Sequence, residues 1–328
     1  MSQEISAPDA VHLSRSSLPV IDICGLSSAS IESRRAVGRA LRDACVDKGF
    51  LYIVNHGVPH ALIDDMFRQA RAFFNLPQAR KQALSLANSP CRHGYEPLKE
   101  QTLHAGTQPD IKEGYYIGRE SSMGSQPMPH LFGANQWPDW LPGFRPVLEA
   151  YFNQMLALSE TMMNGIALSL GLSEDYFNYF CIDPIARLRL LHYPDHPRDA
   201  KPGEQGAGAH TDYGGLTILL QDDLGGLQVF DHKRDEWLHA DPIPGSFVVN
   251  LGDMISRWTN DTYRSTLHRV INLSGKERCS IPFFFHGNPD HQVACIPTCL
   301  APGEEPRYPA TTVERHFMRR MDQSYQKS

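Results

Sequence analysis

Two residues of metal-binding types stand two positions apart in GAHTDYGGLTILLQDDLGGLQVF, the segment from Gly208 to Phe230. They are His210 and Asp212, and on a β-strand this spacing points both side chains to the same face. By itself the pair is better explained by a capped turn. A further histidine, His268, begins a later apolar run, HRVIN. Two imidazoles and one carboxylate can hold a first-row metal ion on one face and leave its other positions open.

A set of short strands is expected to position these three side chains. From Arg187 onward, apolar runs recur about every 8 to 12 residues with turns between them, a spacing typical of a β-barrel or sandwich. The runs are RLRLLHYP, GLTILLQDD, GLQVFD, SFVVNLGD, HRVINLS and RCSIPFFFHGNP. We therefore expect a mainly β fold with flanking helices, whose core is a jelly-roll barrel.

Helices from both ends of the chain are expected to wrap this barrel. The N-terminal half predicts a strand, a helix, a strand and a helix at Leu18–Leu26, Ser30–Phe50, Phe50–Pro59 and His60–Pro77. Apolar residues at helical spacing predict a long helix at Arg145–Leu172 and a last one at Ala310–Tyr325. Residues 78–140 are rich in Pro, Gly, Ser and Gln and predict mainly loop.

These segments suggest four regions along the chain. They are a flexible N-terminal tail (1–17), a region of helices and strands (18–140), the jelly-roll core (141–290) and a C-terminal segment with a helix (291–328).

Composition narrows the class of protein. The 328 residues are 41% hydrophobic and 21% charged, as in soluble globular proteins, and the net charge of −6 does not favour a nucleic-acid partner. The longest apolar runs, such as SFVVNL, are far shorter than the roughly 20 residues of a membrane helix. The N-terminus has no signal-peptide core. We expect a cytoplasmic protein that does not bind membranes, with its seven scattered cysteines reduced.

Several segments resemble the isopenicillin-N-synthase-like branch of the 2-oxoglutarate/Fe(II)-dependent dioxygenase superfamily. They are HTDYGGLTILLQDDLGGLQVF, NLGDMISRWTNDTYRSTLHRV and RCSIPFFFHGNPD, with LPVIDICGL, DKGFLYIVNHGVP, ARAFFNLP and PDIKEGYYIGRE in the N-terminal half. The resemblance covers about residues 18–290 and is specific, because His-x-Asp, a distal His and Arg-x-Ser occur in order. It implies a double-stranded β-helix, which agrees with the strand pattern.

The resemblance assigns roles to particular residues. The metal ligands of the family fall on His210, Asp212 and His268, and its Arg-x-Ser motif falls on Arg278 and Ser280. Arg278 would hold the far carboxylate of 2-oxoglutarate, because a guanidinium is a planar, bidentate donor.

Tyr193 matches the strand tyrosine of the family that also contacts the cosubstrate. Many relatives have Asn before that Tyr, whereas this chain has His192, for which we favour a packing role over a ligand-orienting one. Arg189 is expected to face the same pocket. Aromatic side chains that could line a substrate pocket, or equally pack in the core, are Tyr115, Tyr116, Phe230 and the run Phe283–Phe285.

Three further polar residues are interpreted as structural. His56, in VNHGVP, is expected at a strand-to-helix turn, and Asn250 and Asp253, in NLGD, are expected to shape a tight turn.

The resemblance implies an enzyme, a non-haem Fe(II) oxygenase that uses 2-oxoglutarate and O₂ and releases succinate and CO₂. Its small organic substrate would be hydroxylated, desaturated or cyclised, and whether ascorbate stimulates the reaction is left open. Three alternatives remain at this point: an isopenicillin-N-synthase-like oxidase that needs no 2-oxoglutarate, an ethylene-forming type that fragments 2-oxoglutarate, and a non-catalytic sensor. The substrate and the oligomeric state are not readable from the sequence.

Overall fold

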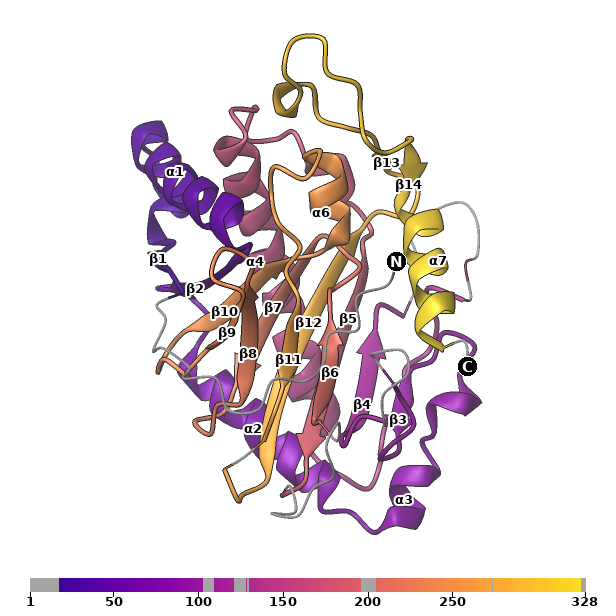
Figure 1. Ribbon diagram of the computed structural model, residues 1–328. Helices are drawn as coiled ribbons and strands as arrows, with labels where there is room; N and C mark the ends of the chain where they lie inside the picture. Colours follow the sequence, from indigo (N-terminus) through magenta and orange to yellow (C-terminus); the bar gives the residue numbers. More distant parts are fainter. Residues whose placement is uncertain are drawn as a thin grey trace.

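Two β-sheets stacked against each other form the centre of the molecule, and helices cover the outer face of the larger sheet (Figure 1). The computed structural model describes residues 18–102, 109–120, 128, 130–195, 205–272 and 274–325. The prediction of a mainly β, jelly-roll core with flanking helices is confirmed. The tail expected at residues 1–17 lies outside the described residues, and the four-region division stays a prediction.

The larger sheet has the strand order β1-β2-β10-β7-β12-β5-β4-β3 among the described residues, and only the β1–β2 pair is parallel. In that order the strands span Val20–Asp22, Phe50–Val54, Phe247–Leu251, Leu216–Gln221, Arg278–Gly287, Ile185–Tyr193, Glu113–Gly118 and Gly94–Glu96. The smaller sheet has the order β6-β11-β8-β9, with strands at Ala207–His210, His268–Val270, Leu227–Asp231 and Glu236–His239. A separate pair joins β13 (Gln292–Val293) and β14 (Thr311–Thr312).

Strand β12 illustrates how the larger sheet separates its two faces. Its odd-numbered apolar residues belong to the core under the helices: Cys279, Ile281, Phe283 and Phe285. Its even-numbered residues line the cavity between the sheets: Arg278, Ser280, Pro282, Phe284 and His286. This alternation is the two-residue period of a β-strand. The segment RCSIPFFFHG therefore contributes side chains both to the hydrophobic core and to the cavity.

Three helices pack on the outer face of the larger sheet, namely α1 (Ile31–Asp47), α2 (His60–Phe74) and α4 (Phe144–Ser169). The hydroxyl of Ser30 caps α1 by accepting the Ser33 N–H at 3.4 Å. Gly49, with φ +64°, turns the chain into β2, and a Cβ there would lie 2.0 Å from the Arg264 carbonyl oxygen. The shorter helices are α3 (Gln78–Gln82), α5 (Asn178–Cys181) and α6 (Asp253–Trp258).

The last helix, α7 (Val313–Tyr325), lies at the side of the barrel beside β4 and β5 (Figure 1). Arg320 of α7 forms an ion pair with Asp253 of α6 at 2.9 Å. The His316 ring donates from Nε2 to the Tyr213 carbonyl at 2.8 Å. These contacts fix α7 against the mouth of the barrel.

The prediction of mainly loop for residues 78–140 is wrong in part. This stretch contains α3 and the two strands β3 and β4, and β4 pairs with β5 along its whole length. Residues 103–108, 121–127 and 129 lie outside the described residues. All seven cysteines are free thiols. Within the described part of the chain, no helix has the length and apolar character that crossing a membrane requires.

Candidate active site

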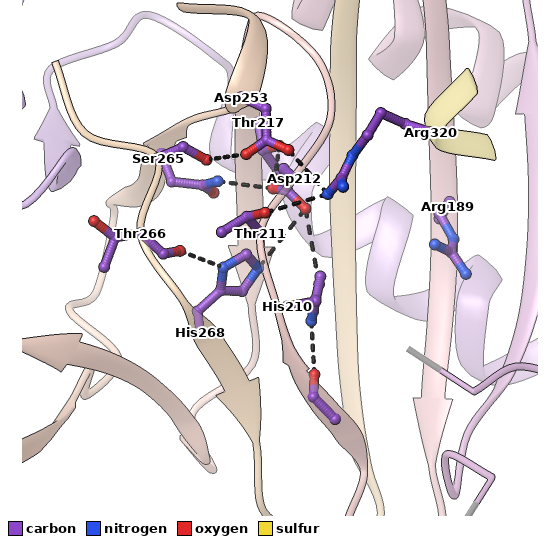
Figure 2. Close-up of polar contacts among 12 residues, drawn as sticks. Arg189, His210, Thr211, Asp212, Thr217, Asp253, Ser265, Thr266, His268 and Arg320 are labelled. Carbon is purple, nitrogen blue, oxygen red and sulfur yellow. Dashed lines mark hydrogen bonds and ion pairs between the residues drawn. The ribbon is translucent and has the colours of Figure 1, made fainter. Parts of the chain in front are cut away.

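His210, Asp212 and His268 meet at the end of the barrel, where β6 and β11 of the smaller sheet lie side by side (Figure 2). The Nε2 atoms of His210 and His268 lie 3.8 Å and 3.7 Å from Asp212 Oδ1. An ion about 2 Å from each donor requires donor separations of about 3 to 4 Å. The three side chains therefore fit one metal ion with its remaining positions facing the cavity.

Hydrogen bonds fix the orientation of both imidazoles. His210 Nδ1 donates to the Gly208 carbonyl at 2.7 Å, and His268 Nδ1 donates to the Thr266 carbonyl at 3.1 Å (Figure 2). With Nδ1 protonated, each ring presents the lone pair of Nε2 toward Asp212. Such outer hydrogen bonds select the tautomer that can bind a metal.

The carboxylate of Asp212 is held by two donors on neighbouring strands. Its Oδ2 accepts the Thr217 hydroxyl at 2.5 Å and the Asn250 amide at 2.7 Å, which leaves Oδ1 for a metal. Asn250, expected only to shape a turn, thus orients a member of the triad. Asn250 lies within β10 rather than in a turn, and the local sequence gave no signal of this contact, because the partner lies 38 residues earlier in the chain.

The Gly-Asp pair after Asn250 supports the loop that carries Asp212. The Asp253 N–H donates to the Asp212 carbonyl at 2.8 Å, and the Met254 N–H donates to the Gly214 carbonyl at 3.2 Å. A Cβ at Gly252 would lie 2.3 Å from that Gly214 oxygen, so only glycine allows this approach. The structural role expected for Asp253 is therefore confirmed.

Burial and mutual contact set the ionisation of the triad. Burial lowers the pKa of His210 to about 3, and the neighbouring His268 contributes to that shift. For Asp212, burial raises the pKa, but His268, His210 and the hydrogen bonds from Asn250 and Thr217 outweigh it and leave the pKa below its usual value. Near neutral pH the site offers a neutral imidazole at His210 and an ionised carboxylate, the forms that bind metals.

Arg278, Ser280 and Tyr193 meet deeper in the same cavity. The guanidinium carbon of Arg278 lies 4.9 Å from the centre of the Tyr193 ring, and the Arg278 side chain is 1% exposed. Its Nε donates to the Gly225 carbonyl at 2.5 Å, whereas its Nη1 is buried with no partner among the described residues. A buried guanidinium edge that lacks an acceptor fits the carboxylate of a bound ligand.

A second part of the cavity opens beside Asp212. The lining consists of Gln101, Tyr116, Arg187, Arg189, His210, Asp212, Tyr213, Phe284, His286, Phe317 and Met321. The expectation that Arg189 faces the pocket is confirmed.

Four of the six aromatic candidates for the pocket lie elsewhere. Tyr115 is fully buried in the helix-covered core, where its hydroxyl donates to the Gln136 carbonyl, and Phe283 and Phe285 belong to the same core. Phe230 contacts Trp237 on the smaller sheet. The other two, Tyr116 and Phe284, are part of the cavity lining.

The two histidines given structural interpretations do not enter the site. The His192 ring stacks on Phe74 with centroids 5.2 Å apart, and its Nδ1 bonds Glu113 Oε1 at 2.9 Å, on the helix-covered face of β5. The packing role favoured for it is confirmed. The Nδ1 of His56 accepts the Val58 N–H at 3.1 Å, which fits a turn.

Sequence reasoning missed several residues of the cavity. Among them are Lys112, Arg187, Thr217, His286 and Phe317. The two-residue period of β5 and β12, counted from Tyr193 and Arg278, would have found Arg187 and His286. No local pattern marks Lys112 or Phe317, because the sequence does not show that the elements carrying them lie beside the cavity.

Family models match most of the chain. Residues 18–140 match the N-terminal region described as "non-haem dioxygenase in morphine synthesis", and residues 184–287 match the 2OG-Fe(II) oxygenase superfamily. The chain is 39% identical over 316 residues to the 2-oxoglutarate-Fe(II) type oxidoreductase hxnY of Emericella nidulans, covering 94% of this chain and 90% of that protein. The chain belongs to the 2-oxoglutarate/Fe(II)-dependent oxygenases.

Solved structures of this oxygenase family superpose closely. A full-length Neurospora crassa protein in complex with alpha-KG gives a TM-score of 0.84 at 31% identity, covering 94% of this chain and 96% of that one. The same Neurospora crassa protein with alpha-KG and thymine gives 0.83 at 30% identity, covering 94% and 97%. JOX2 in complex with 2OG, Fe and JA gives 0.77 at 33% identity, covering 92% and 84%.

The protein is thus a non-haem Fe(II) oxygenase that uses 2-oxoglutarate and O₂ to oxidise a small substrate. This removes the alternatives of an oxidase that needs no 2-oxoglutarate and of a non-catalytic sensor.

Proposed function

We propose that His210, Asp212 and His268 bind Fe(II), that Arg278 holds 2-oxoglutarate, and that the enzyme oxidises a planar organic acid. One observation carries this proposal. The triad opens directly onto a cavity whose lining combines aromatic rings with the guanidinium groups of Arg187 and Arg189.

Fe(II), when bound with 2-oxoglutarate, supplies the chemistry that activates O₂ and removes hydrogen from an unreactive C–H bond, with release of succinate and CO₂. The triad holds the ion from one face, and Thr217 and Asn250 keep Asp212 Oδ1 directed at it. The apolar side chains around the triad, including Phe50 and Leu219, exclude water from the centre.

The far carboxylate of 2-oxoglutarate is assigned to Arg278, Ser280 and Tyr193. Arg278 Nη1 supplies a buried donor, and the hydroxyls of Ser280 and Tyr193 lie within hydrogen-bonding reach of each other. A charged group in such a buried setting binds a carboxylate more strongly than it would at the surface.

The substrate is assigned by the charge and shape of the second part of the cavity. Arg187 and Arg189 face it, and among the described residues of its lining the one carboxylate is Asp212, which the metal requires. Glu96 holds Arg189 at 3.4 Å from behind, and burial lowers the pKa of His286 to about 3, which leaves that ring neutral. The guanidinium groups of Arg187 and Arg189 thus give this part of the cavity hydrogen-bond donors suited to an anionic ligand.

Aromatic side chains give the cavity flat walls. Tyr116, Tyr213, Phe284 and Phe317 all belong to its lining. Flat walls suit a ring or a conjugated chain, because aromatic faces stack on planar groups. By their descriptions, two similar proteins of known structure bind thymine and JA, which supports a small-molecule substrate.

Two finer statements are part of the proposal. We place the enzyme in the isopenicillin-N-synthase-like branch, on the order and spacing of its three motifs, and in the cytoplasm, on its composition. Hydroxylation, desaturation, cyclisation and fragmentation of 2-oxoglutarate itself differ only in the fate of the intermediate, and the lining favours none of them.

The test uses ring-methylated aromatic acids, each paired with its primary amide, for example 4-methylbenzoate with 4-methylbenzamide. Succinate release above the substrate-free background is measured for each pair with the Fe(II)-loaded enzyme. We expect the acids to stimulate succinate release more than their amides, and Arg187→Leu to remove that preference. Amides that stimulate as strongly as the acids would contradict the proposed substrate class.

A further inference from the structure

Lys112 is a buried cation outside the His-x-Asp, distal His and Arg-x-Ser motifs. It precedes β4, is 3% exposed, and lines the part of the cavity that also contains Tyr193, Arg278 and Ser280. Glu113, the next residue, pairs with His192 on β5 and turns to the opposite face of the sheet. Lys112 therefore points between the two sheets, where the cosubstrate binds.

A carboxylate and the backbone hold Lys112 at the seam of the two sheets. Its ammonium forms an ion pair with Asp110, which is equally buried. Asp110 Oδ1 also accepts the Gly208 N–H at 2.9 Å, and the Ile111 N–H donates to the Gln205 carbonyl at 2.9 Å. These bonds join the start of β4 to β6, the strand that carries His210.

The Lys112 ammonium has more donors than partners. An ammonium carries three N–H groups, and Asp110 accepts the only side-chain hydrogen bond of Lys112 among the described residues. A buried donor left without an acceptor is costly. Asp110 balances the charge, but the remaining N–H groups need an acceptor in the cavity.

The position of the ammonium indicates which end of the cosubstrate it meets. Asp110, the ion-pair partner of Lys112, accepts the Gly208 N–H, and the Gly208 carbonyl accepts the His210 imidazole. Arg278 instead donates to the Gly225 carbonyl and lies beside the Tyr193 ring, so of these two cations Lys112 is the one held against the strand of His210.

We propose that Lys112 is a second binding residue for 2-oxoglutarate, donating to the keto-acid end that faces the metal. This inference rests on the proposed placement of iron and 2-oxoglutarate. It assigns the two ends of the cosubstrate to two different cations, Arg278 for the far carboxylate and Lys112 for the near one.

The test compares two keto acids. 2-Oxopentanoate has the keto-acid end of 2-oxoglutarate but a methyl group in place of the far carboxylate. Dissociation constants are measured anaerobically from the visible charge-transfer band of the Fe(II)-loaded protein. We expect Lys112→Met to weaken both ligands by about 10-fold or more, the range for a hydrogen bond to a charged group. We expect Arg278→Met to weaken 2-oxoglutarate and to leave 2-oxopentanoate nearly unchanged.

A double variant separates binding from folding. Lys112→Met alone leaves Asp110 buried and unpaired, whereas Lys112→Met/Asp110→Asn removes both charges. The proposal predicts that the double variant is folded, judged by its thermal unfolding, and still binds both keto acids weakly. Restored affinity in the double variant would show a purely structural role and overturn the proposal.

Two further outcomes are decisive. A loss for 2-oxoglutarate but not for 2-oxopentanoate would overturn the assigned contact, because Lys112 would then act on the far carboxylate. A charge-transfer band absent from the unaltered enzyme would contradict the proposed function itself, whereas a normal band that Lys112→Met does not weaken would contradict only this inference.

Discussion

The two faces of the β4–β5–β12 part of the larger sheet both carry buried charges, yet only one of them forms a site. On the helix-covered face, Lys81 donates to Glu113 at 2.8 Å, and Glu113 also binds His192 and the Tyr95 hydroxyl. On the cavity face, Lys112 pairs with Asp110 and Arg189 pairs with Glu96.

The difference lies in what remains open to a ligand. Burial raises the pKa of Glu113, but hydrogen bonds from His192, Lys81 and Tyr95 outweigh it, and the ring of Phe74 closes the cluster. On the cavity face, Arg278 Nη1 is buried without a protein acceptor. Buried charge alone thus does not mark a functional site; a cavity and unfilled donors do.

The largest expected effect is the loss of a cavity histidine, His210, compared with the loss of a histidine on the helix-covered face, His192. His210→Ala removes a metal ligand, and we expect iron binding and succinate release to fall to background while the chain stays folded. The matched control is His192→Gln, which should retain both. Iron content and turnover of the purified variants measure this, and full turnover in His210→Ala would refute the site.

The next prediction compares two adjacent residues of β12. Phe285→Ala should lower the free energy of unfolding by about 3 to 5 kcal/mol, because it empties a packed core position. Phe284→Ala should cost far less stability and should instead alter the KM of the substrate. Chemical denaturation together with steady-state kinetics distinguishes the two, and equal losses of stability would mean that the faces are wrongly assigned.

A smaller effect is expected at Asn250. Asn250→Ala leaves the three ligands in place but removes the amide that orients Asp212, so metal affinity or activity should fall about 10- to 100-fold. A metal titration followed by an activity assay at saturating iron separates the two contributions. Unchanged values in both would show that Thr217 alone suffices to orient the carboxylate.

The smallest effect concerns a buried histidine outside the cavity. Burial, aided by the charge of Arg187, lowers the pKa of His93 to about 3 in the folded protein. The lowered pKa contributes to the free energy of unfolding in full above the pKa of the unfolded state, about 6.5. This contribution is lost as the pH falls toward 3. By pH 5 the loss is about 2 kcal/mol. His93→Gln should reduce the difference in unfolding free energy between pH 7.5 and 5 by that amount; an unchanged difference would mean that His93 is charged when buried.

The sequence was most informative where the spacing of apolar residues shows which face of a helix or strand each side chain lies on. The periodicity of apolar residues predicted the helices and most of the strands of the jelly roll. The order of the motifs predicted the positions of His210, Asp212 and His268. The aromatic candidates Tyr115 and Phe285 failed where their neighbours Tyr116 and Phe284 did not, because a step of one residue exchanges the faces of a strand.

Other features depend on contacts between distant segments. Asn250 reaches Asp212 across neighbouring strands, and Lys112 enters the cavity only because the start of β4 is bonded to β6. Strand β4 itself was missed, because it lies in a stretch rich in Gly, Pro and Ser. Such contacts have no local signature, and they account for most of the residues that the sequence did not indicate.

The most direct test of the central claim is an anaerobic titration of the Fe(II)-loaded enzyme with 2-oxoglutarate, comparing Arg278→Met from the cavity face with Lys81→Met from the helix-covered face. We predict a saturable charge-transfer band in the unaltered enzyme, greatly weakened affinity in Arg278→Met, and unchanged affinity in Lys81→Met despite its lower stability. Equal affinities in all three proteins would contradict the claim that the cavity face alone binds the cosubstrate.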